Sequence, residues 1–294
     1  MKDPIPFGRY LLLERLDVGG TAEVFLGRLP DGKLRAVKRL LPTVAEQPEL
    51  VELFLAEARA SAALDHRAIV RVLEVGRAET GWFMAMEWVA GRDLAALEAR
   101  LRERGVRLRP PLAAFVAAEI GDALEHAHRR FGAGGRPLGL LHRDLSPRNV
   151  LCAWDGGVKL ADFGLARLAG PRPRGRARYL SPEEAAGRAP GPRSDLFSLG
   201  AVLHELLSGE RFRPEGAAVP PSRWNPAVSP GLDAAVLGAL AADPAARTPT
   251  AADLAAALRP FADPVGARSL ARLLADLFPE ERGRDLERGA RGGE

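Results

Sequence analysis

The stretch HRDLSPRNV (142–150), followed by VKLADFG (158–164), decides how this chain is interpreted. The carboxylate of Asp144 can accept the proton of an incoming hydroxyl, and Asn149 and Asp162 offer the hard oxygen ligands that Mg²⁺ prefers. Each stretch alone could be an ordinary capped turn or a turn at a strand end. Both turns in this order and so close together are improbable by chance, and the combination indicates phosphoryl transfer.

The composition is that of a globular protein with room for a sizeable core. The chain has 294 residues, of which 47% are hydrophobic and 27% charged, and a single cysteine, Cys152. These values exclude a disulfide framework and a thiolate metal cluster. We find no apolar run long enough to span a membrane and no apolar leader at the start, so we expect a cytoplasmic protein.

The basic residues are mostly arginine. Only four of the 42 are lysines (2, 33, 38 and 159), and the net charge is +4. Together with abundant Ala, Gly and Pro this indicates a coding bias rather than a basic binding face, so we expect no nucleic-acid partner. A nucleic-acid binder remains an alternative, and it would show strongly salt-dependent affinity.

The periodicity predicts two lobes of different type. Short strands at 34–40, 68–76 and 81–89, with one helix at 48–64, are expected in the first part of the chain. The rest of the chain is expected to be helical, with helices at 92–104, 111–130, 194–209, 231–242, 250–258 and 267–278. The fold class is therefore α+β, and after residue 278 the polar end is expected to be frayed.

A glycine-rich turn in LDVGGTAEVFLGR (16–28) lies between two predicted strands. Gly19 and Gly20 would let backbone N–H groups approach a phosphate closely, although an ordinary hairpin turn is as good an explanation for this stretch alone. Compared with the pattern GxGxxGxV, Asp17 replaces the first glycine and Ala22 the third, while Val24 is in place.

Lys38, in AVK on a predicted strand, can reach the α- and β-phosphates of a nucleotide. A lone strand lysine is usually a solvated one, but lysine is scarce in this chain, which favours a function for its compact ammonium group. Glu57 on the 48–64 helix can orient Lys38. Glu49 and Glu52 share that helix, so Glu57 is favoured but not unique.

Taken in order, these features resemble the protein kinases, specifically the Hanks-type (eukaryotic-like) Ser/Thr kinases of bacteria. The resemblance covers about residues 8–260 and implies a bilobal kinase domain at 8–262, with an N-lobe at 8–86, a hinge at 87–93 and a C-lobe at 94–262. It implies Mg (or Mn) and ATP, protein substrates, and a C-terminal extension at 263–294. It also implies that Asp195 bonds the backbone of the HRD turn and that Arg247 pairs with Glu183.

The resemblance also assigns the adenine site to the link MEWVAGRD (86–93). Met86 would be the gatekeeper, Glu87 and Val89 would offer backbone hydrogen bonds to adenine, and Asp93 would reach the ribose. The apolar walls around the purine would come from Leu16, Val24, Ala36 and Leu151.

The chain departs from the family pattern in four places. Ser146 replaces a lysine that neutralises the transferred phosphate, at a cost of about 2 kcal/mol in the transition state. Arg176 stands where a threonine is usual, and we hypothesise that its guanidinium supplies the missing cation. The segment between Gly164 and Ser181 has no Ser or Thr, so no Ser/Thr activation-loop switch is expected. The 209–226 stretch has no room for the helix that usually docks substrates.

Two functions follow from these features. The first is an active kinase that transfers phosphate to Ser or Thr hydroxyls, since HRDLSP lacks the HRDLAARN-like form of tyrosine kinases. The second is a pseudokinase that serves as a nucleotide-binding or scaffold module, favoured by the degraded glycine turn, Ser146 and Arg176. In either case the input signal could come from a regulatory protein partner.

Overall fold

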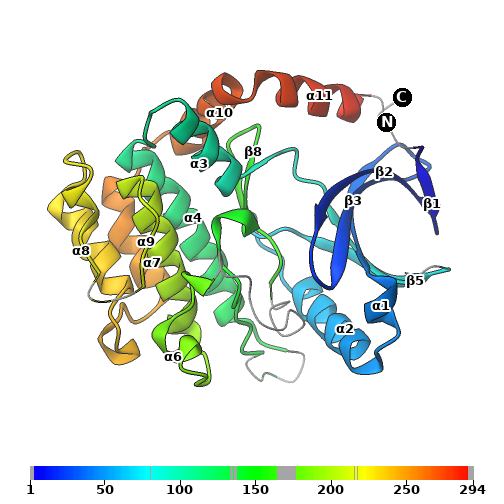
Figure 1. Ribbon diagram of the computed structural model, residues 1–294, viewed down its shortest axis with the longest axis horizontal. Helices are drawn as coiled ribbons and strands as arrows, with labels where there is room; N and C mark the ends of the chain where they lie inside the picture. The colour runs from blue at the N-terminus through cyan, green and yellow to red at the C-terminus, as the bar shows by residue number, and fades with distance from the viewer. Residues whose placement is uncertain are drawn as a thin grey trace.

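The fold was obtained as a computed structural model, which describes residues 3–79, 81–132, 135, 138–163, 177–214, 216 and 218–290, with the side chain of Glu57 outside the description. It consists of a small lobe built on a curled antiparallel sheet and a large helical lobe (Figure 1). The structure therefore confirms the α+β bilobal fold class expected from the sequence.

The small lobe contains a six-stranded sheet with the order β1-β2-β3-β4-β6-β5, in which every neighbouring pair is antiparallel. Its strands are β1 (Ile5–Phe7), β2 (Tyr10–Val18), β3 (Ala22–Arg28), β4 (Leu34–Leu40), β5 (Val72–Ala78) and β6 (Gly81–Glu87). The short helix α1 (Pro42–Ala45) and the longer α2 (Pro48–Ala62) cover one face.

Each face of this sheet packs on its own apolar cluster, as expected for a curled sheet. One cluster joins the sheet to α2 through the fully buried Phe54 and Met84, and the other fills the opposite face around Phe25 and Val37. On strand β3, Ala22 belongs to the first cluster and Phe25 to the second, because residues an odd number of positions apart on a strand face opposite sides of the sheet.

The large lobe contains a second, three-stranded sheet of β7 (Gly91–Asp93), β8 (Val150–Ala153) and β9 (Val158–Leu160). Its longer helices are α3 (Leu94–Glu103), α4 (Pro110–His128), α7 (Pro192–Ser208), α8 (Pro230–Ala239), α9 (Ala251–Leu258), α10 (Gly266–Leu277) and α11 (Pro279–Ala290), with the single turn α6 (Pro182–Ala185). The 3₁₀ turns are η1 (Pro147–Asn149), η3 (Pro221–Arg223), η4 (Pro244–Ala246) and η5 (Arg259–Phe261).

Helix α7 is the central support of the large lobe. It is buried nearly all round, as its continuous apolar sequence predicts, and it packs against α4, α8 and α9. It ends at Gly209, which takes the left-handed conformation (φ 75°) that closes many helices and that favours glycine.

Two predictions about segments near the ends of elements are corrected. The strand expected at 68–76 begins only at Val72, because Ile69 instead bridges β9 in the large lobe. The frayed end expected after residue 278 is wrong for 279–290, which form helix α11. Pro279 in the first position and two glutamates in the first turn are ordinary helix-start signals.

The expected lack of a docking helix after α7 is confirmed for the described residues. Between Gly209 and Asn225 they include only the three-residue turn η3. Within the described part of the chain, no helix combines the length and apolar character needed to cross a bilayer. The domain limits at 8 and 262 stay a prediction.

Candidate functional site

The loop 142–149 is held by a buried carboxylate on α7. Asp195 accepts hydrogen bonds from the backbone N–H groups of His142 and Arg143, both at 2.9 Å, and from the His128 ring at 2.8 Å. These contacts confirm the role expected of Asp195. They also allow Arg143 to keep a left-handed backbone (φ 64°) that a non-glycine residue rarely adopts.

The pKa of Asp195 shows how this support works. Burial alone would raise the pKa, but the hydrogen bond and charge of His128 and the backbone donors hold it below its usual range. The carboxylate therefore stays ionised at neutral pH. His142 is fully buried, burial lowers its pKa, and its Nε2 lies 2.8 Å from the carbonyl oxygen of Ala161.

The two residues expected to handle the proton and the metal lie side by side. Asn149 donates through Nδ2 to the backbone oxygen of Asp144 at 2.7 Å and to Oδ2 of Asp144 at 3.1 Å. The backbone oxygen of Asn149 accepts from Ala161 N at 2.8 Å, which places Asp162 next to this pair. Because Nδ2 is used internally, Oδ1 is the atom of Asn149 that can face a cation.

Lys38 reaches across from the small lobe to this cluster. Its Nζ donates to Oδ1 of Asp162 at 2.6 Å, and the lysine side chain is only 13% exposed. Asp162 has a left-handed backbone (φ 60°). Asp162 and Lys38 are thus brought together as predicted, while the pairing of Lys38 with Glu57 stays a prediction, because the Glu57 side chain lies outside the described residues.

The oxygens of Asn149 and Asp162 suit Mg²⁺ or Mn²⁺, since both are hard ligands and one carries a charge. Among the described residues, no three His, Cys, Asp or Glu side chains gather in a way that could hold a metal ion alone. A cation at this place would therefore complete its shell with water and with oxygens from a bound substrate.

The expected apolar walls come from both lobes. The buried cluster that contains Met86, itself 6% exposed, is covered by Ala36 of β4, by Leu151 of β8 and by Val89, which lies between β6 and β7. Val24 is the partner of Lys38 in the β3–β4 register. Leu16 is 44% exposed on β2, so it is available to a ligand.

The glycine turn lies between β2 and β3, as predicted. Gly19 N donates to the Ala22 carbonyl at 2.8 Å, and a Cβ at Gly20 would meet nothing within 4 Å. Glu87 N donates to the Arg71 carbonyl at 2.9 Å, so the N–H of Glu87 is already used.

Asp93 has a role that the sequence reasoning missed. Its Oδ1 accepts from Ala96 N at 2.8 Å and caps the start of α3. The signal was an Asp directly before an apolar helical pattern, which is a common N-cap. Burial raises the pKa of this carboxyl. Gly91, two residues earlier, allows β7 and β8 to approach, because a Cβ there would lie 2.1 Å from the Cys152 carbonyl oxygen.

The pair expected between Arg247 and Glu183 is confirmed and is bidentate. Both guanidinium-to-carboxylate distances are 2.7 Å, and the two residues are 2% and 5% exposed. Burial alone would raise the pKa of Glu183, but the hydrogen bonds from Arg247 and Ser194 lower it to about 2. This pair fixes the segment that follows the activation segment.

Two departures from the family pattern have different outcomes. Ser146 is 2% exposed, and its Oγ has no hydrogen-bond partner among the described residues. Arg176 and most of the activation segment, 164–176, lie outside the described residues. Tyr179 is buried, and its hydroxyl donates to Glu205 at 2.6 Å.

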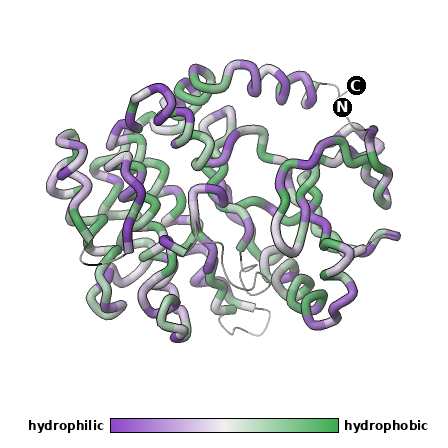
Figure 2. The backbone as a smooth tube through the Cα atoms, viewed as in Figure 1, coloured by the Kyte–Doolittle hydropathy of each residue, from purple (hydrophilic) through white to green (hydrophobic). Residues whose placement is uncertain are grey.

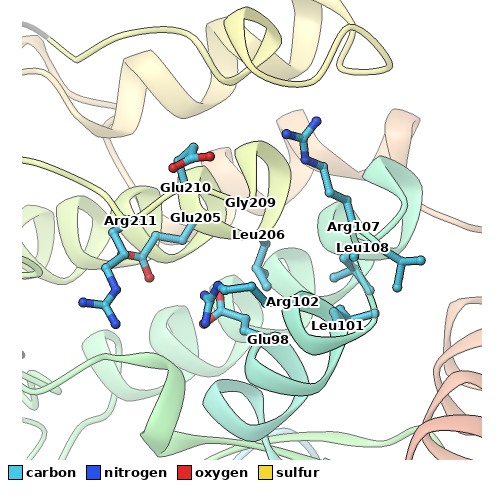
Figure 3. Close-up of a pocket in the computed structure, with 12 residues that line it drawn as sticks. Glu98, Leu101, Arg102, Arg107, Leu108, Glu205, Leu206, Gly209, Glu210 and Arg211 are labelled. Carbon is cyan, nitrogen blue, oxygen red and sulfur yellow. The ribbon is translucent and has the colours of Figure 1, made fainter.

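A separate pocket of about 240 Å³ lies in the large lobe between α3 and the end of α7 (Figure 3). Glu98, Arg102, Glu205 and Arg211 are among its lining residues. Burial, followed by the negative charge of Glu205, raises the pKa of Glu98 to about 8. Sequence reasoning missed this pocket because its walls come from elements that are distant in the chain.

The protein kinase domain family model matches residues 10–218. The tyrosine-protein kinase MasK of Myxococcus xanthus is 36% identical over 94% of this chain and 47% of its own length. The serine/threonine-protein kinase PknB of Mycolicibacterium smegmatis is 37% identical over 85% of this chain and 42% of its own length. This chain thus spans less than half the length of those relatives.

Solved structures of protein kinase domains also match this chain. The PknI kinase domain of Mycobacterium tuberculosis superposes with a TM-score of 0.70 at 26% identity, covering 89% of this chain and 99% of that domain. The family model spans residues of both lobes and includes Lys38, Asp144, Asn149 and Asp162. The chain belongs to the protein kinase domain family, and its resemblance to the Hanks-type kinases of bacteria is confirmed.

Proposed function

We propose that this protein transfers the γ-phosphate of Mg·ATP to Ser or Thr hydroxyls of protein substrates. The observation that carries the proposal is the junction between the lobes. There the Asn149 amide lies 3.1 Å from the Asp144 carboxylate, and the Lys38 ammonium lies 2.6 Å from Asp162.

Each residue of this cluster has a definite task. Asp144 accepts the proton of the attacking hydroxyl, and Lys38 positions the α- and β-phosphates once nucleotide separates it from Asp162. Asn149 and Asp162 would hold Mg²⁺ or Mn²⁺, which neutralises charge on the phosphates. Glu57 orients Lys38 in the nucleotide-bound form.

The nucleotide site uses residues from both lobes. The adenine ring lies between apolar side chains, with hydrogen bonds to the backbone of Glu87 and Val89 and with Met86 closing the rear of the site. Asp93 reaches the ribose in addition to capping α3. The remaining contacts come from Leu16, Gly19, Gly20, Val24, Ala36 and Leu151.

We assign Ser and Thr as acceptors because HRDLSPRN lacks the form typical of tyrosine kinases. MasK carries the name of a tyrosine kinase, so the acceptor has to be tested directly. Acid hydrolysis of a labelled substrate, followed by phosphoamino-acid separation, should give phosphoserine or phosphothreonine. Phosphotyrosine as the main product would overturn this assignment.

Ser146 and Arg176 form the second part of the proposal. The buried Ser146 hydroxyl cannot supply the positive charge of the family lysine, and Arg176 is the candidate to supply it. Arg176→Ala should lower turnover about thirtyfold, the equivalent of about 2 kcal/mol, with little change in ATP binding. Unchanged turnover would reject this role. We also infer that phosphorylation of Ser or Thr in the activation segment does not switch the enzyme on. Phosphopeptide mapping of active protein that places a site within 165–180 would refute this.

A pseudokinase is the second candidate, and the unusual glycine turn and Ser146 favour it. The deciding experiment incubates purified protein with Mg·[γ-³²P]ATP and generic protein substrates, next to Asp144→Asn and Lys38→Met. Loss of the proton acceptor should reduce transfer by about 10²- to 10⁴-fold. Equal label transfer by wild type and Asp144→Asn would favour the pseudokinase.

We further infer a cytoplasmic location and a regulatory protein partner. A pull-down from the native host tests the partner, and a specific protein should be recovered with the folded chain and not with the unfolded chain.

A further inference from the structure

We propose that helix α11 is a brace behind the interlobe link, which holds the glycine-rich hairpin of the small lobe to the large lobe through Asp285 and Arg288. These are positioning residues for nucleotide binding, and that part of the inference rests on the proposed function. In Figure 1, α10 and α11 run along one edge of the molecule from the large lobe toward β2.

The first half of the extension is firmly attached to the large lobe. Leu270, Leu274 and Leu277 of α10 are at most 2% exposed and belong to the core of that lobe. The guanidinium of Arg100 on α3 lies 4.8 Å from the centre of the Phe278 ring. Gly156 in the β8–β9 turn touches α10 so closely that a Cβ would lie 1.7 Å from the Ala267 carbonyl oxygen.

Asp285 is the main anchor of α11. It is 6% exposed and accepts from Trp154 Nε1 at 3.1 Å and from Arg92 Nη1 at 3.2 Å, while Arg288 lies 3.4 Å away on the next turn. The Arg92 guanidinium also lies 5.1 Å from the centre of the Trp154 ring. A buried carboxylate with several donors resists displacement, because removing the donors would leave its charge without compensation.

Arg92 connects this anchor to the interlobe link. It lies on β7, in the last part of the link (86–93) and directly before Asp93, the N-cap of α3. The position of Asp285 is therefore fixed relative to the end of the link and to the β7–β8 sheet.

The contact of α11 with the small lobe is much weaker. Arg288 donates through Nη2 to Oε2 of Glu14 on β2, and the two side chains are 37% and 49% exposed. A cavity of about 1110 Å³, lined by Arg284 and Arg288 and by residues of β1–β4, separates the rest of α11 from the sheet. Figure 2 shows α11 as a mostly hydrophilic helix, consistent with a polar contact rather than a packed one.

The brace is thus strong at one end and weak at the other. Glu14 lies on the strand that leads into Gly19 and Gly20, so the Arg288–Glu14 pair limits how far the hairpin moves away from the large lobe. Because exposed ion pairs contribute little energy, the brace biases the separation of the lobes without locking it. Any partner that draws Arg288 away would loosen the nucleotide site from behind.

The test is a charge-reversal cycle in the full 294-residue chain. Glu14→Arg and Arg288→Glu should each weaken binding of Mg·ADP, measured by calorimetry, by about two- to fivefold. The double reversal should restore most of the binding, although it does not restore the contact of Arg288 with Asp285. Hydrogen exchange of the backbone amides at 10–28 should rise in the single variants and fall back most of the way to the wild-type rate in the double variant.

Arg282→Glu is the matched control on the same helix. Its exposed side chain makes no ion pair with the residues that the structure describes, so exchange and binding should match the wild type. Exchange that is unchanged in both single variants, or an effect that the double reversal does not restore, would overturn the brace. Absence of Mg·ADP binding in the wild type would instead refute the proposed function, and hydrogen exchange would still decide on the brace.

Discussion

The loop 142–149 and the glycine-rich hairpin both serve the phosphates in our proposal, but they are held in opposite ways. The loop rests on the buried Asp195, which accepts two of its backbone N–H groups. The hairpin leaves Leu16 and Val18 at 44% and 53% exposed, and the contact of its first strand with α11 is a surface ion pair.

This difference follows from what each region has to do. Groups that accept a proton or hold a metal need positions fixed by buried supporting bonds. A hairpin that covers a nucleotide has to open to admit it and release it, so a region with few buried contacts is suitable. The predictions below test how far this contrast extends.

The largest effect is expected from breaking the buried pair that holds the segment after the activation segment. Arg247→Ala leaves the Glu183 carboxylate buried without its bidentate partner, which should lower the free energy of unfolding by about 3–5 kcal/mol. Arg259→Ala, which removes an exposed pair with Asp122, should cost less than about 1 kcal/mol. Urea denaturation of the two variants measures both values, and similar losses would show that burial does not distinguish them.

A smaller effect is expected from weakening the support of the loop itself. Asp195→Asn keeps the size of the side chain but removes the charge and one of the two oxygens that accept from the loop. Turnover should fall about tenfold or more, at a cost of about 1.5–3 kcal/mol, with the Kd for nucleotide within about twofold. Steady-state kinetics and calorimetry measure the two quantities, and a larger change in Kd than in turnover would contradict the prediction.

Glu98 is a carboxyl group of the large lobe for which the effect of burial on the pKa outweighs that of neighbouring positive charges, in contrast to Asp195 and Glu183. Its pKa of about 8 lies above the ordinary value of 4.5, so the folded protein keeps a proton that the unfolded chain releases. The contribution of Glu98 to stability therefore falls as the pH rises from about 4.5 to 8. Glu98→Gln should be close to neutral near pH 4.5 and should stabilise the fold by an amount that grows as the pH rises to 8.

Thermal denaturation across that pH range measures the Glu98 effect. Glu103→Gln, on the same helix with a side chain that is 69% exposed, is the control and should show no such trend. A stability difference that does not change with pH would mean that Glu98 is ionised in the folded protein.

The smallest effect is expected in the glycine turn. A Cβ at Gly20 meets no atom within 4 Å, so Gly20→Ala should change stability by less than about 0.5 kcal/mol. The Kd for nucleotide should change less than about threefold, which tests whether close backbone approach matters at this position. Gly91→Ala is the contrasting variant, because its Cβ would collide with the β8 backbone and should destabilise strongly.

Particular residues show how far the sequence could predict the structure. Asp195, Arg247 and Glu183 were placed correctly, because motif order determines which elements meet in this family. The strand expected at 68–76 started too early, since Ile69 bridges to β9 and only tertiary contact reveals that. Helix α11 was expected to be frayed, because its polar sequence gives no apolar stripe. The contacts that anchor it at Asp285 come from residues far away in the chain.

The candidate site divides in the same way. Lys38, Asp144, Asn149 and Asp162 were predicted from motif order and spacing, the structure brings them to one junction, and their roles stay a prediction. Asp93 as a helix cap and the pocket around Glu98 were missed, because a side chain's partner cannot be deduced from its own residue type. The places of Glu57 and Arg176 in the site stay predictions.

The sequence by itself determined the lobes, the family and the four residues at the junction, because local periodicity and motif spacing are written along the chain. Only the tertiary structure decided how these parts are supported. Asp195 acts through groups that lie 53 and 52 positions away, and Arg288 meets a strand 274 positions away. Such contacts depend on where the folded chain returns to itself, and no local pattern carries that information.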